Sequence, residues 1–369
     1  MKFSCEKYLL QAACTTAARA TASKSPIHAL EGLLIEAGGD VKVTGYDLKE
    51  GIYTIIGADI SQIGSLVVNA RLFGDIIRKL PDGIVTVTTD GLNVNVKCGK
   101  SDFNIMGISP EEYPEMPDVD DQEEIVLPEK TLRSMINQTL FAVATNDARP
   151  IYTGALFEAE GDTLTIVAID GYRLAKRTEK LEKTREEAIH FVVPGTALGD
   201  VERICEEKDE TVRIAVGSKH ISFTIGETVV ITRRLEGEFI NYKRSIPESF
   251  RHVLKIDRSE FISVIDRVSL IISEKNSSPV HLFLSDGNIE CSCVTPIGKA
   301  EDVCLCEGDG EGLEIGFNDR YLIDALKAAG KEELFFCLNT ASSPCILKAA
   351  DGTEDFIYMI LPVRLRAND

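Results

Sequence analysis

The sequence GLLIEAGGD at residues 32–40 returns at residues 154–162 as GALFEAEGD, and a looser copy, VHLFLSDG, occupies residues 280–287. The copies start 122 and 126 positions apart. After each copy comes a segment in which apolar and polar residues alternate, as is typical of a strand. Gly and Asp separate the two segments, so each copy predicts a β-hairpin. Recurrence at this interval indicates three similar domains.

A junction between a strand and a helix recurs in the same register. It reads VNARLFGD at residues 68–75, VPGTALGD at 193–200 and FNDRYLID at 317–324, and the closing aspartates lie 125 and 124 positions apart. The apolar spacing predicts six amphipathic helices, two in each copy, over residues 6–20, 71–79, 129–141, 196–208, 258–271 and 318–330. Each copy is therefore expected to be an α+β domain with two helices packed on antiparallel sheets.

Composition places the boundaries between the copies. Residues 110–124 are rich in Pro and acidic side chains, and residues 245–250 occupy the corresponding place after the second copy. Both segments are predicted to be linkers. The expected domains are residues 1–122, 123–250 and 251–369.

The bulk composition excludes several classes of protein. Of 369 residues 44% are hydrophobic, which is enough to form cores. No apolar run approaches the roughly 18 residues of a membrane span, and the first residues lack the apolar stretch of a secretory signal, so a cytoplasmic location is expected. The ten cysteines are thinly spread and no metal-binding spacing accompanies them. We expect buried structural thiols, including Cys291, Cys293, Cys304 and Cys306, and neither a metal site nor a cofactor.

The net charge of -19 argues against tight binding to nucleic acid phosphates. The charge is unevenly distributed, however. The six predicted helices together carry +2, which leaves -21 on the remainder of the chain. If the helices share one face, that face is mildly basic and the rest of the surface is strongly acidic.

Several segments match a known family. They are MKF at residues 1–3, DAR at 147–149, DGYRLA at 170–175, GEFINYKR at 237–244 and LPVRL at 361–365. In this order, and with the threefold repeat, the chain resembles the bacterial sliding clamps, the beta subunits of DNA polymerase III. The resemblance covers essentially the whole chain.

The resemblance implies a ring of six domains, formed by two three-domain protomers arranged head to tail, with helices lining a central hole. Duplex DNA would pass through the hole, and the ring would confer processivity by tethering the replicative polymerase and other replication and repair proteins. The clamp loader and repair polymerases are implied as further partners. Catalysis by the chain itself is not expected.

The family also suggests three groups of functional residues. A hydrophobic groove that receives short peptides from partners is matched by Tyr152, Ile169, Gly171, Tyr172, Arg173, Leu174, Ile240, Arg244, Ser245, Ser343, Leu361, Pro362, Val363 and Arg364. Its arginines are expected to meet acidic or carbonyl groups of the peptide. Positions that contact DNA are matched by Lys24, Arg71, Asn146, Pro150 and Ile151. The dimer interface is matched by Phe103 and Ile105 on an edge strand, by Leu270 and Ile271 on a helix, and by Lys100 opposite acids near Glu301 and Asp302.

Three departures from the family pattern affect these groups. Ile240 stands where the best-known clamps have Pro, which alters the shape of the groove. Pro150 and Ile151 replace aromatic residues, so weaker contact with DNA is expected. Asp102 occupies a position that is often basic, and a weaker dimer would follow.

Two other functions are compatible with the sequence. Asp147, Asp170 and Arg173 could form an acid/base set of an enzyme, although no nucleophile, metal cluster or phosphate loop accompanies them. Alternatively, the threefold repeat could be a scaffold that binds only proteins. Retention on circular DNA would separate a clamp from such a scaffold.

Overall fold

The computed structural model describes residues 1–120, 123–146, 149–273 and 278–365. The chain forms two compact units, of which the first comprises residues 1–133 and 196–234 and the second residues 134–195 and 235–369. The expected middle copy, residues 123–250, is divided between them. Helix α3 (Glu129–Leu140) begins in the first unit and ends in the second, whereas α4 (Gly195–Ile204) lies almost wholly in the first.

The first unit contains two antiparallel sheets and the helices α1 (Lys7–Ala17) and α2 (Ala70–Lys79). One sheet has the order β5 (Asp59–Gln62), β1 (Lys2–Glu6), β7 (Ile84–Asp90), β8 (Asn93–Cys98) and β9 (Ser101–Met106). The other has the order β10 (Glu123–Pro128), β15 (Thr211–Val216), β16 (His220–Ile225), β17 (Thr228–Arg233), β4 (Glu50–Ile56), β3 (Val41–Tyr46), β2 (Gly32–Ala37) and β6 (Gly64–Asn69).

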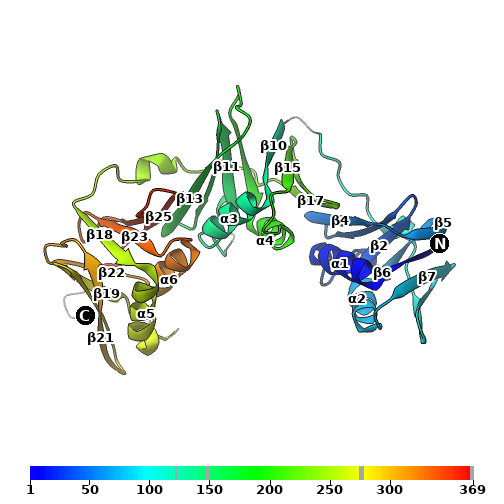
Figure 1. Ribbon diagram of the computed structural model, residues 1–369, viewed down its shortest axis with the longest axis horizontal. Coiled ribbons are helices and arrows are strands. Elements are labelled where there is room, and N and C mark those ends of the chain that lie inside the picture. Colours follow the sequence, from blue (N-terminus) through cyan, green and yellow to red (C-terminus); the bar gives the residue numbers. More distant parts are fainter. Residues whose placement is uncertain (121–122, 147–148, 274–277, 366–369) are drawn as a thin grey trace. The chain divides into compact units, whose positions relative to one another are not determined.

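The core of the first repeat lies between these layers. Helices α1 and α2 contact each other and pack on strands of the larger sheet (Figure 1). Fully buried side chains from both sheets and both helices, among them Phe3, Leu10, Ile35 and Phe73, form one cluster. At about 25 cal/mol for each Å² of apolar surface removed from water, this burial is the main force holding the layers together.

The second unit is built on a single twelve-stranded antiparallel sheet. Its order is β14 (Ile189–Pro194), β11 (Gly154–Glu160), β12 (Thr163–Ile169), β13 (Arg173–Lys180), β25 (Asp355–Ile360), β24 (Cys345–Ala349), β23 (Glu333–Leu338), β18 (His252–Asp257), β21 (Gly298–Glu307), β20 (Asn288–Thr295), β19 (Val280–Ser285) and β22 (Leu313–Phe317). Helices α5 (Arg258–Val268) and α6 (Asp319–Ala328) contact each other and pack on strands of this sheet (Figure 1).

The three predicted hairpins are confirmed. They are the antiparallel pairs β2–β3, β11–β12 and β19–β20. Gly161 and Gly287 turn the second and third hairpins with positive φ values of 58° and 74°, a backbone region that other residues rarely adopt. The similarity of the three copies therefore reflects one repeated structural unit.

All six predicted helices are present, with one substantial difference in length. Helix α4 ends at Ile204, whereas the sequence predicted a helix to residue 208. The carboxylate of Glu129 accepts the Glu206 N–H at 2.8 Å, and the Lys208 and Glu210 carbonyls accept N–H groups from the start of α3. The Glu206 N–H is the group that a longer helix would need for its own hydrogen bond, and the contacts with α3 hold the following residues in a non-helical course.

Two ladders join strands that are remote in sequence. Strand β17 pairs with β4 from Thr228↔Thr54 to Thr232↔Glu50, and β13 pairs with β25 from Arg173↔Ile360 to Thr178↔Asp355. Neighbouring copies thus pair with each other through their strand edges. Each ladder also removes two edges that could otherwise pair with foreign strands.

Other expectations from composition concern cysteines, charge and membranes. Cys291, Cys293 and Cys304 are buried as expected, and Cys306 is half-buried. The helices α1 to α6 carry +1, +2, +1, -1, 0 and 0, a total of +3, so the charge outside them is -22. Among the described residues, no helix is both long and apolar enough to cross a bilayer.

Candidate functional site

Four residues of the predicted groove, all in the second unit, expose large apolar side chains. Tyr172, Ile240, Leu361 and Val363 are exposed by 62%, 45%, 38% and 40%. Large apolar side chains are normally buried, so a group of them at the surface indicates a place where something binds. We refer to these four residues as the apolar surface.

Strand pairing brings Tyr172 and Leu361 together. Because Arg173 of β13 pairs with Ile360 of β25, the residues that flank this pair are neighbours, and the Leu361 N–H donates to the Tyr172 carbonyl at 2.9 Å. Figure 1 shows these two strands side by side. Val363 is held by its N–H, which donates to the Gly316 carbonyl in β22 at 2.8 Å.

The turn that presents Tyr172 is built from its immediate neighbours. Gly171 has a φ of 96°, which favours glycine at this position. The Asp170 carboxylate accepts the N–H groups of Tyr172 and Arg173 at 2.9 and 3.0 Å. This Asx turn fixes the direction in which the tyrosine leaves the sheet.

The structure gives Arg173 an internal role that differs from the expected contact with a peptide. The residue is only 9% exposed, and its guanidinium donates to Asp170 Oδ2 at 2.9 Å and to Asp324 Oδ2 of α6 at 2.6 Å. It also lies 4.6 Å from the ring centre of Tyr321 and 5.5 Å from that of Phe141. The Tyr172 ring in turn stacks on Tyr321 at 6.1 Å. Arg173 therefore ties the presenting turn to α6.

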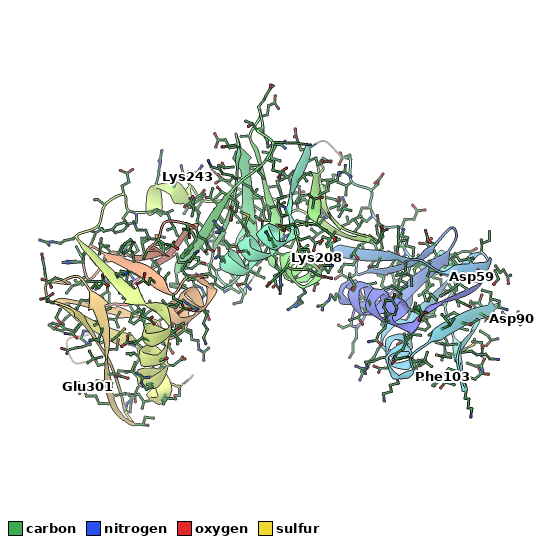
Figure 2. All side chains as sticks on the ribbon, viewed as in Figure 1. Asp59, Asp90, Phe103, Lys208, Lys243 and Glu301 are labelled. Carbon is green, nitrogen blue, oxygen red and sulfur yellow. The ribbon has the colours of Figure 1, made fainter. Side chains whose placement is uncertain are left out.

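The other two groove arginines are placed differently. Arg244 lies in the 3-10 helix Tyr242–Ser245 and Arg364 follows β25, and both are exposed. Figure 2 shows Lys243, the neighbour of Arg244, at the surface of the same short helix. These positions leave Arg244 and Arg364 accessible to the acidic or carbonyl groups of a ligand.

A buried cluster, which we call the groove cluster, underlies this region. Leu174 is fully buried and Ile169 is 9% exposed, so these two predicted groove residues form its interior and not the accessible surface. Tyr152 is half-buried and its ring lies 5.5 Å from that of Phe239 in an edge-on arrangement. The whole cluster contains Leu156, Val167, Ile169, Leu174, Val192, Tyr242, Cys337, Ile346 and Met359.

Several members of the groove cluster are not among the residues predicted from the sequence. Met359 and Ile346 lie on the paired strands β25 and β24, where their alternation with other apolar residues resembles ordinary core. Phe239 packs on the cluster from the segment before Tyr242. The Tyr242 hydroxyl donates to the Glu158 carboxylate, and burial together with this bond raises the pKa of Tyr242. Two aromatic residues, Phe239 and Tyr242, lie close to Ile240 on either side in the sequence. They were the sequence signal that could have indicated this part of the cluster.

Three polar or small groove residues lie at the ends of elements. Ser245 is exposed at the end of the 3-10 helix Tyr242–Ser245, and Pro362 is half-buried between Leu361 and Val363. Ser343 lies in the turn between β23 and β24, where its hydroxyl is 2.7 Å from Thr340 Oγ1. Its contact is thus local to that turn.

The positions predicted to contact DNA are distributed over both units. Lys24 and Arg71 are exposed in the first unit, Arg71 in the first turn of α2. Asn146 and Pro150 are exposed in the second unit. Ile151 is half-buried and packs against the groove cluster, so its apolar side chain is used within the fold.

The positions predicted at the dimer interface lie on two open sheet margins. Strand β9, which carries Phe103 and Ile105, is the last strand of its sheet. Phe103 is 40% exposed and lies at the margin of the first unit (Figure 2), whereas Ile105 packs partly on the core of that unit. The exposed Lys100 lies in the turn before β9.

The second margin is provided by β21. It pairs with β18 only through Glu307 and Cys306, so among the described residues its segment 298–305 pairs on one side, with β20. Leu270, in the 3-10 helix Ser269–Ile271, is 81% exposed, and Ile271 is half-buried. The acids expected to face Lys100 already have partners, because Asp302 pairs with Arg267 at 2.6 Å and Glu301 pairs with Lys299. Figure 2 shows Glu301 on this margin.

The geometry also bears on the enzyme hypothesis. Asp170 is engaged in capping its turn and in pairing with Arg173, and Asp147 lies outside the described residues. Among the described residues, no group of three His, Cys, Asp or Glu side chains could hold a metal ion. The internal pairing of Asp170 and Arg173 accounts for both residues without a catalytic role.

Comparison with known proteins identifies the family. Models of the DNA polymerase III beta subunit match in succession, the N-terminal domain at residues 1–117, the central domain at 126–241 and the C-terminal domain at 243–364. The chain is 34% identical over 358 residues to a beta sliding clamp of Staphylococcus aureus, covering 94% of each chain. It is 32% identical over 361 residues to that of Halalkalibacterium halodurans, covering 94% of this chain and 95% of the relative.

Solved structures agree with this assignment. The crystal structure of the DNA polymerase sliding clamp from Bacillus subtilis matches with a TM-score of 0.94 at 30% identity, covering 99% of this chain and all of that one. A putative DNA polymerase III beta subunit from Eubacterium rectale matches with a TM-score of 0.93 at 33% identity and the same coverage. The chain therefore belongs to the DNA polymerase III beta subunit family, the bacterial sliding clamps.

Proposed function

We propose that two copies of this chain close head to tail into a ring of six domains that encircles duplex DNA and confers processivity on the replicative polymerase. The observation that carries the proposal is the succession of three clamp domain matches along one chain. The chain is a non-catalytic subunit, as its family is. The domain boundaries at residues 122 and 250 are part of the proposal, supported by the start of β10 at Glu123 and of β18 at His252.

The two open sheet margins support a head-to-tail dimer. In the part of the chain that the structure describes, each has one side without a paired strand and an exposed apolar side chain, Phe103 on β9 and Leu270 beside β21. A contact between two different surfaces of one chain can repeat until a ring closes. Asp102 is engaged with Lys97 at 3.2 Å, which partly neutralises the acid that stands at an often basic position.

The distribution of charge supports sliding on DNA over tight binding. The six helices carry +3 and the rest of the chain -22. A weakly basic helical lining contacts phosphates through few ion pairs, so the ring moves along the duplex, and its acidic outer surface is repelled by DNA. Lys24 and Arg71 are the exposed cations proposed to face the phosphates.

The apolar surface is the proposed docking site for peptides of partner proteins. An apolar side chain of the peptide would contact Tyr172, Leu361 and Val363, while Arg244 and Arg364 pair with its acidic or carbonyl groups. The proposed partners are the replicative polymerase, the clamp loader and the repair polymerases, and the proposed location is the cytoplasm.

Loading on circular DNA tests the proposal. The protein is loaded by a clamp loader onto nicked circular DNA, and the circle is then linearised. A ring should remain on the circle and leave the linear form by sliding off its ends. Retention on linear DNA, or failure to associate with the circle, would contradict encirclement and would favour a scaffold that binds only proteins.

A further inference from the structure

The first unit contains a second site that the clamp function does not explain. A pocket of about 640 Å³ lies where β2, β3 and β6 meet residues 110–116. Its lining includes Leu34, Thr44 and Met116 and the carboxylates of Glu36, Glu111 and Glu115. Pockets of this size commonly hold a small ligand or a few side chains of a partner.

Strand register shows that this pocket is the counterpart, in the first repeat, of the groove cluster in the second. Leu34 pairs with Thr44 on β3 and with Val67 on β6. Leu156, at the same place in the second repeat, pairs with Val167 on β12 and with Val192 on β14. Leu156, Val167 and Val192 all belong to the groove cluster.

The chemistry of the two places differs at the position of Thr44. Thr44 stands where the second repeat has Val167, and it is only 2% exposed. Among the described residues its Oγ1 atom has no hydrogen-bond partner. A buried hydroxyl without a partner is costly, and such a group in a native structure often serves a ligand.

A second difference lies in how the two places are filled. In the first repeat Gly51 pairs with Tyr46, and in the second repeat the corresponding pair is Leu174 with Ile169. Gly51 therefore stands where the second repeat has Leu174. The Met116 side chain packs into the space this glycine leaves, since a Cβ at Gly51 would lie 2.4 Å from Met116 Cε. Methionine is unbranched and adaptable, so this filling can move aside where a leucine on the sheet could not.

The charge around the pocket is unbalanced. Among the described residues that line the pocket, Glu36, Glu111 and Glu115 are accompanied by one cation, Lys42, whose Nζ lies 3.7 Å from Glu36 Oε2. The exposed Glu111 and Glu115 therefore leave a net negative rim. A ligand with a positive charge complements this rim, and an acidic ligand is repelled.

We propose that this pocket is a docking site for a short segment of a partner protein that carries an apolar side chain next to Lys or Arg. The apolar side chain contacts Leu34 and displaces Met116. The cation pairs with Glu111 and Glu115, and a main-chain group of the segment supplies the partner that Thr44 Oγ1 lacks. The inference does not rest on the proposed role of the apolar surface.

Methyl NMR on the full-length protein tests the site directly. The chain has five methionines, of which Met116 lines the pocket and Met359 belongs to the groove cluster. Protein labelled with ¹³C at the methionine methyls is titrated with the peptide acetyl-Arg-Leu-Arg-Leu-amide and, separately, with acetyl-Glu-Leu-Glu-Leu-amide. The basic peptide should shift the Met116 signal in a saturable way and leave Met359 in place.

Two results of this titration would overturn the inference. One is a Met116 signal that does not move at about 5 mM basic peptide, a concentration that detects even millimolar affinity. The other is an equal response to the acidic peptide. The apolar surface is tested separately with a polymerase tail peptide, which should shift the Met359 signal and leave Met116 in place. The proposals for the two sites can therefore be confirmed or refuted independently.

Variants define the contacts. The double change Glu111→Gln and Glu115→Gln should weaken binding of the basic peptide at least fivefold, whereas Glu112→Gln, an exposed neighbour outside the pocket lining, should change it less than twofold. If the double change and Glu112→Gln weaken binding equally, the carboxylates of Glu111 and Glu115 do not pair with the cation of the ligand. Thr44→Val, which copies the second repeat, should keep the fold and weaken binding at least threefold, and unchanged affinity would exclude Thr44 from the site.

Discussion

Replacing Arg173 by Met should destabilise the second unit and affect partner binding only indirectly. The substitution keeps an aliphatic stem and removes the guanidinium that joins Asp170 to Asp324. Loss of one member of a fully buried ion pair costs about 3–5 kcal/mol, because the other charge remains without a partner. The cost is lower where water or other donors can still solvate the remaining charge.

The surroundings of the two carboxylates reduce the cost. The Asp324 side chain is 43% exposed, so water can solvate its charge once the arginine is gone. The Asp170 side chain is only 12% exposed, but it keeps the N–H groups of Tyr172 and Arg173 as donors. We therefore expect a loss of about 2–3 kcal/mol in the free energy of unfolding.

The assay pairs this variant with Arg244→Met. Unfolding in urea, followed by circular dichroism, should show a lower midpoint for Arg173→Met and a change within about 0.5 kcal/mol for Arg244→Met, because Arg244 is exposed. Fluorescence titration with a polymerase tail peptide should show the reverse order of effects. If Arg173→Met keeps the midpoint and weakens peptide binding as much as Arg244→Met, the internal role of Arg173 is refuted.

Three further predictions concern other parts of the molecule. Changing Leu361 and Pro362 to Ala should weaken binding of the tail peptide at least tenfold by titration, and unchanged affinity would remove the apolar surface as its site. Phe103→Asp should weaken dimerisation at least tenfold in analytical ultracentrifugation, because it places a charge at an apolar contact; a dimer of unchanged affinity would exclude β9 from the interface. Burial, and then the charges of Asp200 and Asp47, raise the pKa of Glu50 to about 8 from an ordinary 4.5. The folded state therefore holds a proton that the unfolded state has lost, so stability should fall as the pH rises from about 4.5 to 8, by about 2 kcal/mol or more, and Glu50→Gln should abolish this slope in urea unfolding. A parallel pH dependence in Glu50→Gln would assign the slope to another group.

The repeat could be predicted from sequence because short stretches of neighbouring residues determine its hairpins and helix starts. Alternation and a Gly-Asp turn specify each hairpin, and caps such as Asn69, whose side chain accepts the Leu72 N–H at 2.9 Å, mark the helix starts. The end of α4 could not be read in this way, since the carboxylate of Glu129 that intercepts Glu206 is 77 residues away. Local propensity contains no information about such a bond.

The same distinction applies to the candidate site. Residues next to strand ends, such as Tyr172 and Leu361, are exposed where the family pattern predicts a surface. Leu174 and Arg173 follow in the same motif yet point into the fold, Leu174 to the groove cluster and Arg173 to Asp324, 151 residues later in the chain. A motif thus identifies a functional region, while the direction of each side chain depends on partners that the motif does not contain.

The ladders β17–β4 and β13–β25 have a consequence for synthesis on the ribosome. Thr54 in β4 is synthesised before its pairing partner Thr228, which lies 174 residues later in the chain. At roughly 5–20 residues per second, β4 stays without this partner for about 10–35 seconds of translation. The nascent chain must therefore protect a bare strand edge throughout that time, and slower elongation through the middle copy would lengthen the interval in which two unfinished chains can pair with each other.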